Sequence, residues 1–292
     1  MDDVTTADGR TLEVLVTGPD SALALVYHSG TPSAAVPWPA LDRVAGAQGV
    51  RAVTWSRPGY AGSTEQPGRS VADVAADTVT VLDALGLGEF VTLGWSGGGP
   101  HALACAALLP ERCLAAATLA GAGPYGVAGL DFLAGMAQEN RLEFGAALEG
   151  HDALDRVLIE MSNGLGSVTP DQVAESLGGL VSEVDRQSLT GELAAYLAAA
   201  LAASVSTGVA GWRDDDLAFT RRWGFDLDDI TVPVAVWQGR QDLMVPPSHG
   251  RWLAAHVPGA RARLFEDEGH LSLVNRLDEI VADLTASAAR ST

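Results

Sequence analysis

Residues 89–110, EFVTLGWSGGGPHALACAALLP, constrain the fold more tightly than any other stretch of the chain. The segment EFVTLGW has the apolar character of a buried strand, and the segment after the glycines has that of a helix. Only Ser96 and three glycines separate them. A buried strand that runs directly into a helix is a building block of α/β proteins, and it predicts a tight turn at Ser96.

The rest of the first half repeats this alternation, with a helix predicted from Ser70 to about Leu85. Strand-like runs cover residues 11–18, 22–30, 50–56, 114–122 and 233–240. The later runs are continuously apolar, as expected of parallel strands that are covered by helices on both faces. The predicted fold class is therefore α/β, with a doubly wound, mostly parallel sheet.

A different pattern fills residues 124–222, where only helical periodicity is found. Leu154, Val157, Leu158 and Met161, for example, recur at the spacing of one helix face. We therefore predict an α/β core made of residues 1–123 and 223–292, interrupted by an inserted helical unit.

Composition excludes several classes of function. The 37 acidic and 18 basic residues leave a net charge of −19, which repels nucleic acid and anionic lipid surfaces. All the basic residues are arginines, so chemistry that needs a lysine, such as a Schiff base or a Walker phosphate loop, is ruled out. We expect a small-molecule substrate, neither cofactor nor metal, and no nucleic-acid partner; the oligomeric state is not indicated.

Localisation follows from three weaker signals. The longest apolar stretches, around residues 102–110 and 193–205, are shorter than the roughly 20 residues that cross a bilayer. Cys105 and Cys113 flank a predicted helix end where a disulfide would be strained, and the first ten residues are acidic and polar. A cytoplasmic protein without a membrane segment is expected.

Ser96 is the candidate nucleophile. Together with Gly94 and Gly98 it fits the pattern G-x-S-x-G, in which a strained turn presents the serine at the carboxyl end of the sheet. Such a serine needs a base and an orienting acid, which follow it in the order acid, then histidine. Asp242 comes just after one predicted strand and His270 just after the next, so these two residues are the predicted acid and base.

Other residues compete for both roles. Asp242 could instead cap a helix, in which case the acid would be Asp226, Asp228 or Asp229. The competing histidines are placed less favourably along the chain: His101, His151, His249 and His256.

An oxyanion would need preorganised N–H donors. One is predicted to be the backbone N–H of Gly97, next to the nucleophile. The other should come from the turn Gly30-Thr31-Pro32. Because proline has no N–H, Thr31 is the first candidate and Gly30 the second.

At this point the sequence resembles the α/β-hydrolase family over nearly its whole length. The matching segments are HSGTP (28–32), RPGYAGS (57–63), GWSGGGP (94–100) and GRQDLMVP with EGH (239–246 and 268–270). Members commonly have His-Gly in the oxyanion loop and aspartate before Arg-Pro-Gly, whereas this chain has Ser29-Gly30 and Ser56-Arg57. The resemblance also implies that residues 124–222 form a helical cap, inserted after the sixth strand.

The resemblance implies acyl transfer to water by a Ser-His-Asp triad, because related dehalogenases and epoxide hydrolases carry aspartate at the position of Ser96. We expect a small, apolar or uncharged ester, thioester or lactone to be hydrolysed. The alternatives are a carbon-carbon bond hydrolase and a proline iminopeptidase-like amide hydrolase, or else a ligand-binding protein without activity. In the iminopeptidase alternative, cap carboxylates would hold the substrate amine; the candidates are Glu139, Glu143 and Glu149. Trp95, His101 and Tyr125 are predicted to line the substrate pocket.

Overall fold

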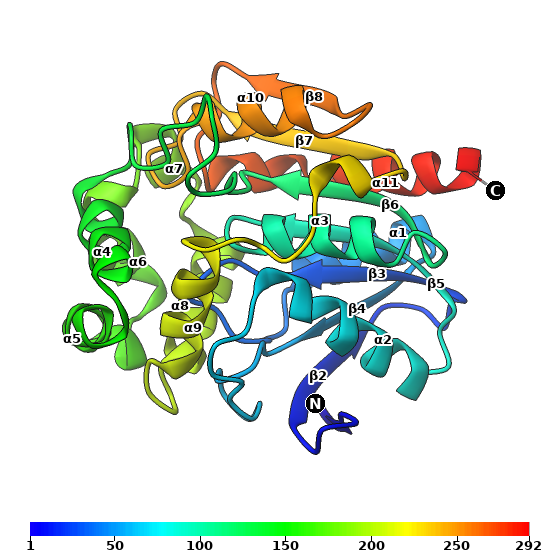
Figure 1. Ribbon diagram of the computed structural model, residues 1–292, viewed down its shortest axis with the longest axis horizontal. Helices are drawn as coiled ribbons and strands as arrows, with labels where there is room; N and C mark the ends of the chain where they lie inside the picture. Colours follow the sequence, from blue (N-terminus) through cyan, green and yellow to red (C-terminus); the bar gives the residue numbers. More distant parts are fainter. Residues whose placement is uncertain (292) are drawn as a thin grey trace.

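The computed structural model describes residues 1–291, and its centre is an eight-stranded sheet in the order β1-β2-β4-β3-β5-β6-β7-β8 (Figure 1). β2 runs antiparallel to both β1 and β4, and all other neighbours are parallel, so the predicted mostly parallel sheet is confirmed. The strands are β1 (Asp2–Thr5), β2 (Thr11–Thr17), β3 (Leu23–His28), β4 (Arg51–Trp55), β5 (Glu89–Trp95), β6 (Cys113–Leu119), β7 (Val234–Gly239) and β8 (Arg261–Phe265).

Helices cover both faces of this sheet. One face is covered by α1 (Pro39–Gln48) and α11 (Leu277–Ser291), and the other by α2 (Val74–Ala84), α3 (Gly98–Leu108) and α10 (Pro247–His256). Within β3, Leu25 packs against the first set of helices and Val26 against the second. Because both side-chain directions end in an apolar core, the central strands read as unbroken apolar runs.

The strand that the sequence did not predict is β1. Its four residues, DDVT, are acidic and mostly exposed, and they pair only with β2 at the edge of the sheet. Aspartate is depleted in strands, so no local signal marks this element. Its pairing with β2 is a tertiary effect.

Between β6 and β7 the chain is helical. Its helices are α4 (Gln138–Glu149), α5 (His151–Met161), α6 (Val173–Ser176), α7 (Glu183–Ser188), α8 (Gly191–Ser204) and α9 (Ala210–Phe219). They gather beyond the end of the sheet toward which the parallel strands point (Figure 1). We propose residues 124–222 as a separate unit and refer to it as the cap. Across residues 1–291, no helix combines the length and apolar character that a bilayer crossing requires.

Candidate active site

Ser96 occupies the sharp turn between β5 and α3. Its φ of +56° lies in the left-handed region, which a serine rarely adopts and which often marks a functional position. A Cβ atom on Gly94 would collide with the carbonyl oxygen of Gly98, and one on Gly98 would collide with that of His28. The two glycines of the motif are therefore required because strand, turn and helix approach one another at backbone distance.

Asp242 and His270 meet beyond the ends of β7 and β8. Asp242 Oδ2 accepts hydrogen bonds from His270 Nδ1 at 2.8 Å and from Gln238 Nε2 at 3.0 Å. Its Oδ1 accepts from the backbone N–H groups of Met244 and Val245. Both Asp242 and His270 are 2% exposed. The carboxylate is thus fixed on both oxygens, and it holds the imidazole through Nδ1.

The electrostatic surroundings favour the charged form of His270. Burial alone would lower its pKa, but the carboxylates of Asp242 and Asp185 outweigh this and raise the pKa above the usual histidine value. Ser96 lines the same cavity as His270, and within residues 1–291 its hydroxyl has no hydrogen-bond partner. A hydrogen bond between a nucleophile and its base is often long in a protein without substrate, and it tightens only when a substrate is bound.

Asp185, for which no sequence pattern indicates a role, holds the loop that carries His270. It belongs to α7 and is fully buried. Its Oδ1 accepts from the N–H groups of Leu271 at 2.7 Å and Ser272 at 2.8 Å. Its Oδ2 accepts from the N–H of His270 at 3.1 Å and from the hydroxyl of Ser182 at 2.7 Å. A cap carboxylate therefore contacts the backbone of the predicted base itself.

The two predicted oxyanion donors belong to neighbouring loops. A Cβ on Gly97 would lie 2.5 Å from Thr31 Oγ1, and a Cβ on Gly30 would lie 3.3 Å from Cβ of Ser96. Within the described residues, the N–H groups of Gly97 and Thr31 donate no hydrogen bond. The loop that holds Gly30 and Thr31 therefore lies against the turn that holds Ser96 and Gly97.

Arg57 holds the oxyanion loop, residues 29–31, by hydrogen bonds. Its Nη1 donates to the carbonyl of Ser29, and its Nη2 donates to the carbonyl of Gly30, both at 2.7 Å. Nη2 also reaches Thr31 Oγ1 at 2.9 Å. A rigid, planar guanidinium suits several acceptors at once. The three residues of the loop are thus tied to one side chain.

Asp215, from α9 of the cap, neutralises this arginine. It accepts from Arg57 Nη2 at 2.7 Å, Arg69 Nη2 at 2.6 Å, Tyr60 Oη at 3.0 Å and Thr31 Oγ1 at 3.0 Å. Burial alone would raise its pKa, but the two guanidinium groups hold the pKa of Asp215 well below the usual carboxyl value. The network is charged and fully enclosed.

Where members of the family commonly have aspartate, Ser56 uses a neighbouring carboxylate. Its hydroxyl donates to Glu13 Oε2 at 2.9 Å and accepts from the backbone N–H of Ala35 at 3.0 Å. The departure from the family pattern therefore leaves this position hydrogen-bonded.

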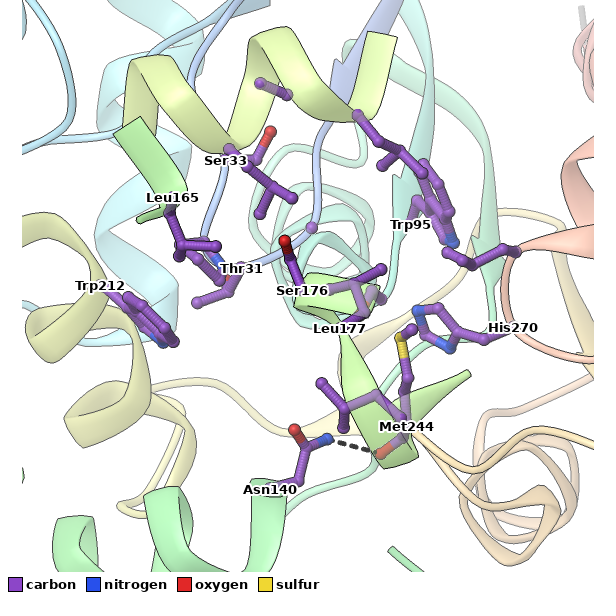
Figure 2. Close-up of a pocket in the computed structure, with 18 of the residues that line it drawn as sticks. Thr31, Ser33, Trp95, Asn140, Leu165, Ser176, Leu177, Trp212, Met244 and His270 are labelled. Carbon is purple, nitrogen blue, oxygen red and sulfur yellow. Dashed lines mark hydrogen bonds between the residues drawn. The ribbon is translucent and has the colours of Figure 1, made fainter. Parts of the chain in front are cut away.

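A cavity of about 150 Å³ lies between cap and core. In Figure 2, Trp95 and His270 form one side, with Trp212 and Leu165 opposite them. Trp95 is stacked between His270 and Trp38, with ring centroids 6.0 and 5.8 Å away. The cap contributes mainly apolar side chains: Met161, Leu165, Leu177, Leu180, Leu197 and Leu201.

Two predicted pocket residues lie elsewhere. His101, in the first turn of α3, is 2% exposed and points into the protein, where it packs against His28 and Phe219. Tyr125 is 37% exposed and contacts the edge of Phe132. Nearness to Ser96 or to the start of the cap does not fix side-chain direction, so only Trp95 of the three predicted residues lines the cavity.

The competing acids and bases are not assembled with Ser96. Asp226, Asp228 and Asp229 are exposed around a short helical turn. His249 links the N–H of Gly123 to the carbonyl of Phe132, and burial lowers its pKa to about 4. The other two histidines lie at exposed sites: His256 stacks on Trp252, and His151 lies beside Asp152.

Of the three glutamates that the iminopeptidase alternative would use, only Glu143 is buried at the cavity. Its Oε1 accepts from Trp212 Nε1 at 2.7 Å, and its carboxyl neighbours that of Asp216. Burial raises the pKa of both acids, and the Glu143 charge raises that of Asp216 further. Glu139 instead accepts from the N–H of Gly179, and Glu149 is exposed.

Comparison with known proteins identifies the family to which the chain belongs. The family model described as alpha/beta hydrolase fold matches residues 24–277. A non-heme chloroperoxidase from Streptomyces lividans is 29% identical over 290 residues, which is 98% of this chain and 99% of that protein. A rhodomycin D methylesterase from Streptomyces peucetius is 28% identical over 211 residues, 68% of this chain and 66% of that protein.

Among solved structures, the enol-lactonase from Burkholderia xenovorans LB400 superposes with a TM-score of 0.69 at 18% identity, covering 99% of this chain and 100% of that one. At that identity the likeness concerns the fold. The match of the family model to residues 24–277 shows that the chain belongs to the α/β-hydrolase family, and the predicted enzyme class, hydrolase, is confirmed.

Proposed function

We propose that this protein is a serine hydrolase that cleaves a small ester, thioester or lactone with an apolar or uncharged acyl group, through an acyl-enzyme on Ser96. The observation that carries the proposal is that Ser96 and His270 line the same cavity, with His270 hydrogen-bonded to the buried Asp242. The rhodomycin D methylesterase among the relatives supports an ester as substrate.

In the first half-reaction, His270 Nε2 takes the proton of the Ser96 hydroxyl, and Oγ attacks the substrate carbonyl. Asp242 keeps the proton of His270 on Nδ1 and stabilises the imidazolium. The developing oxyanion accepts hydrogen bonds from the N–H groups of Thr31 and Gly97. Collapse of the tetrahedral intermediate expels the alcohol or thiol, which receives its proton from His270.

In the second half-reaction, water attacks the acyl-enzyme. His270 removes the proton from the water and returns one to Ser96, which releases the acid. The cavity of about 150 Å³ has a volume that elsewhere accepts a benzene-sized molecule, so the acyl group is small. Its apolar cap side chains favour acyl groups without charge.

We also propose a cytoplasmic location, where reduced thiols persist. Cys105 and Cys113 are buried and carry free thiols.

The test is labelling by a fluorophosphonate probe, together with hydrolysis of p-nitrophenyl esters of increasing chain length. We expect Ser96→Ala to lose the label and to lower kcat by up to about a millionfold, while Ser206→Ala, at an exposed serine of the cap, behaves as wild type. Turnover by Ser96→Ala near the wild-type rate would contradict the nucleophile assignment. Failure of the wild-type protein to label or turn over would favour a binding protein.

The chloroperoxidase relative, which spans nearly the whole chain, calls for one further assay. Chlorination of an organic acceptor by chloride and hydrogen peroxide should be absent or should require Ser96. Chlorination that persists in Ser96→Ala would point to a different reaction.

A further inference from the structure

We propose that Asp185 is a positioning residue for the reaction, holding His270 in place from the cap. The inference rests on the proposed function, in which His270 is the base. Asp185 lies in the cap. It does not come after a core strand, and it is not part of any motif on which the family resemblance rests.

The first support is the completeness of the contact. Three consecutive N–H groups, those of His270, Leu271 and Ser272, all donate to the Asp185 carboxylate, and Ser182 supplies the fourth hydrogen bond. A carboxylate has about four acceptor sites, so each is used. No arginine or histidine side chain forms an ion pair with Asp185 in the described part of the chain. Burying a carboxylate without a cation is costly unless hydrogen bonds replace the lost water.

The second support is where those N–H groups come from. They lead into the short 3-10 helix Ser272–Arg276, whose first donors have no partner within the helix. A carboxylate that caps a helix start normally comes from the same segment. Here it comes from α7, 85 residues before His270 in the sequence. The cap therefore supplies a hydrogen-bond acceptor that the histidine loop lacks.

The third support is the shape of the loop around the carboxylate. A Cβ on Gly269 would overlap both oxygens of Asp185, so a glycine is needed directly before His270 for the carboxylate to approach. At the end of β7, a Cβ on Gly239 would overlap the carbonyl oxygens of Glu268 and Gly269, so this loop lies directly against the strand. The loop is therefore confined between a core strand on one side and a cap carboxylate on the other.

His270 is consequently held at two points by two carboxylates of different origin. Asp242 of the core holds the ring through Nδ1, and Asp185 of the cap holds the backbone N–H. Of the other charged groups of this loop, Glu268 pairs with Arg276 at 2.9 Å, Glu266 pairs with Arg240 at 2.6 Å, and Asp267 is exposed. Asp185 thus contributes both geometry and negative charge, and these two contributions can be measured separately.

The experiment compares Asp185→Asn with Glu183→Gln, which removes an exposed charge from the same helix. Asparagine keeps the shape, but its NH2 group replaces one of the two oxygens. Either the His270 N–H and the Ser182 hydroxyl, or the N–H groups of Leu271 and Ser272, then lose their acceptor. Displacement of a reacting group by about 1 Å costs on the order of 100-fold, and we expect a kcat loss of that size with KM nearly unchanged. The acid limb of the kcat/KM profile should move to lower pH, because a negative charge that raises the pKa of His270 is gone. Glu183→Gln should match wild type in all three.

Ser182→Ala separates geometry from charge, because it removes one hydrogen bond to Asp185 and leaves the carboxylate in place. We expect a smaller kcat loss and no movement of the acid limb. Thermal unfolding reports whether each variant is folded, and if Asp185→Asn does not fold, Ser182→Ala decides alone. A folded Asp185→Asn with wild-type kcat and pH profile, or an unaffected Ser182→Ala where only that variant folds, overturns the proposal. A wild-type protein that neither labels nor hydrolyses esters instead overturns the proposed function.

Discussion

Replacing Asp215 by asparagine should both destabilise the protein and slow it. Asp215 is fully buried and bonds to Arg57, Arg69, Tyr60 and Thr31. An asparagine keeps one acceptor oxygen, but its NH2 group must face one of the two guanidinium groups. Arg69 retains Asp214 at 3.5 Å, whereas Arg57 is left as a buried cation without an anion.

The size of the effect follows from that uncompensated charge. Removing one partner of a buried ion pair costs about 3–5 kcal/mol, and the oxygen that remains favours the lower figure, about 3 kcal/mol. At about 2–4 °C per kcal/mol for a chain somewhat smaller than this one, Tm should fall by about 6–12 °C. Arg57 also braces the oxyanion loop, and loss of one oxyanion donor costs about 100-fold or more in kcat. A kcat loss on the order of 100-fold is therefore expected.

Differential scanning calorimetry and kcat on a short p-nitrophenyl ester measure the two effects. Asp152→Asn is the matched control, since its carboxylate lies on the surface of the cap, where a substitution changes stability by less than about 0.5 kcal/mol. A variant with the Tm and kcat of wild type would refute the reasoning that Asp215 neutralises Arg57. A lower Tm with unchanged kcat would show that the network stabilises the fold without shaping the oxyanion loop.

Two further outcomes follow from the site. Asp242→Asn should keep the fold and lower kcat on the order of ten-thousandfold, because an amide favours the wrong tautomer of His270. The control Asp228→Asn, at an exposed aspartate, should have no effect. A large kcat loss in Asp228→Asn with none in Asp242→Asn would contradict the assignment. Glu143 and Asp216 have raised pKa values in the folded protein, so their contribution to stability is fully present below the unfolded-state carboxyl pKa and is lost as pH rises toward the folded-state values. The fall in Tm between pH 5 and pH 8 should therefore be smaller in Glu143→Gln than in wild type. An unchanged fall would show that the pair does not hold a proton.

The fold and the three principal candidate residues were predictable because their signals are local. Ser96 follows its strand directly, and Asp242 and His270 follow theirs within a few residues, so strand ends alone bring them to one edge of the sheet. Asp185 and Asp215 carry no such signal. Each lies in a charged helical stretch that reads as a solvated surface, and their partners are 85 and 158 residues away in the sequence.

The same limit explains the pocket residues. His101 is close to Ser96 in sequence, but the direction in which a helix places it depends on what packs behind the helix, here Phe219 of the cap. Short-range patterns locate the ends of strands; they do not locate contacts made by an insert.

The cap is attached to the core by many polar contacts, among them the Tyr27–Tyr196 hydroxyl pair and the Arg43–Glu192 ion pair, and this limits how a substrate can reach Ser96. Besides Asp185 and Asp215, Asn140 of α4 donates to the carbonyl of Met244, in the loop that follows Asp242 (Figure 2). A rigid lift of the whole cap would break all of these contacts at once and expose the charge of Arg57. The hydrogen bonds of residues 165–180, by contrast, stay within the cap, and Leu165, Leu177 and Leu180 of this segment line the cavity. Movement of that segment alone would admit a small molecule while the histidine and oxyanion loops stay assembled. Substrate access and the arrangement of the catalytic groups can therefore be altered independently.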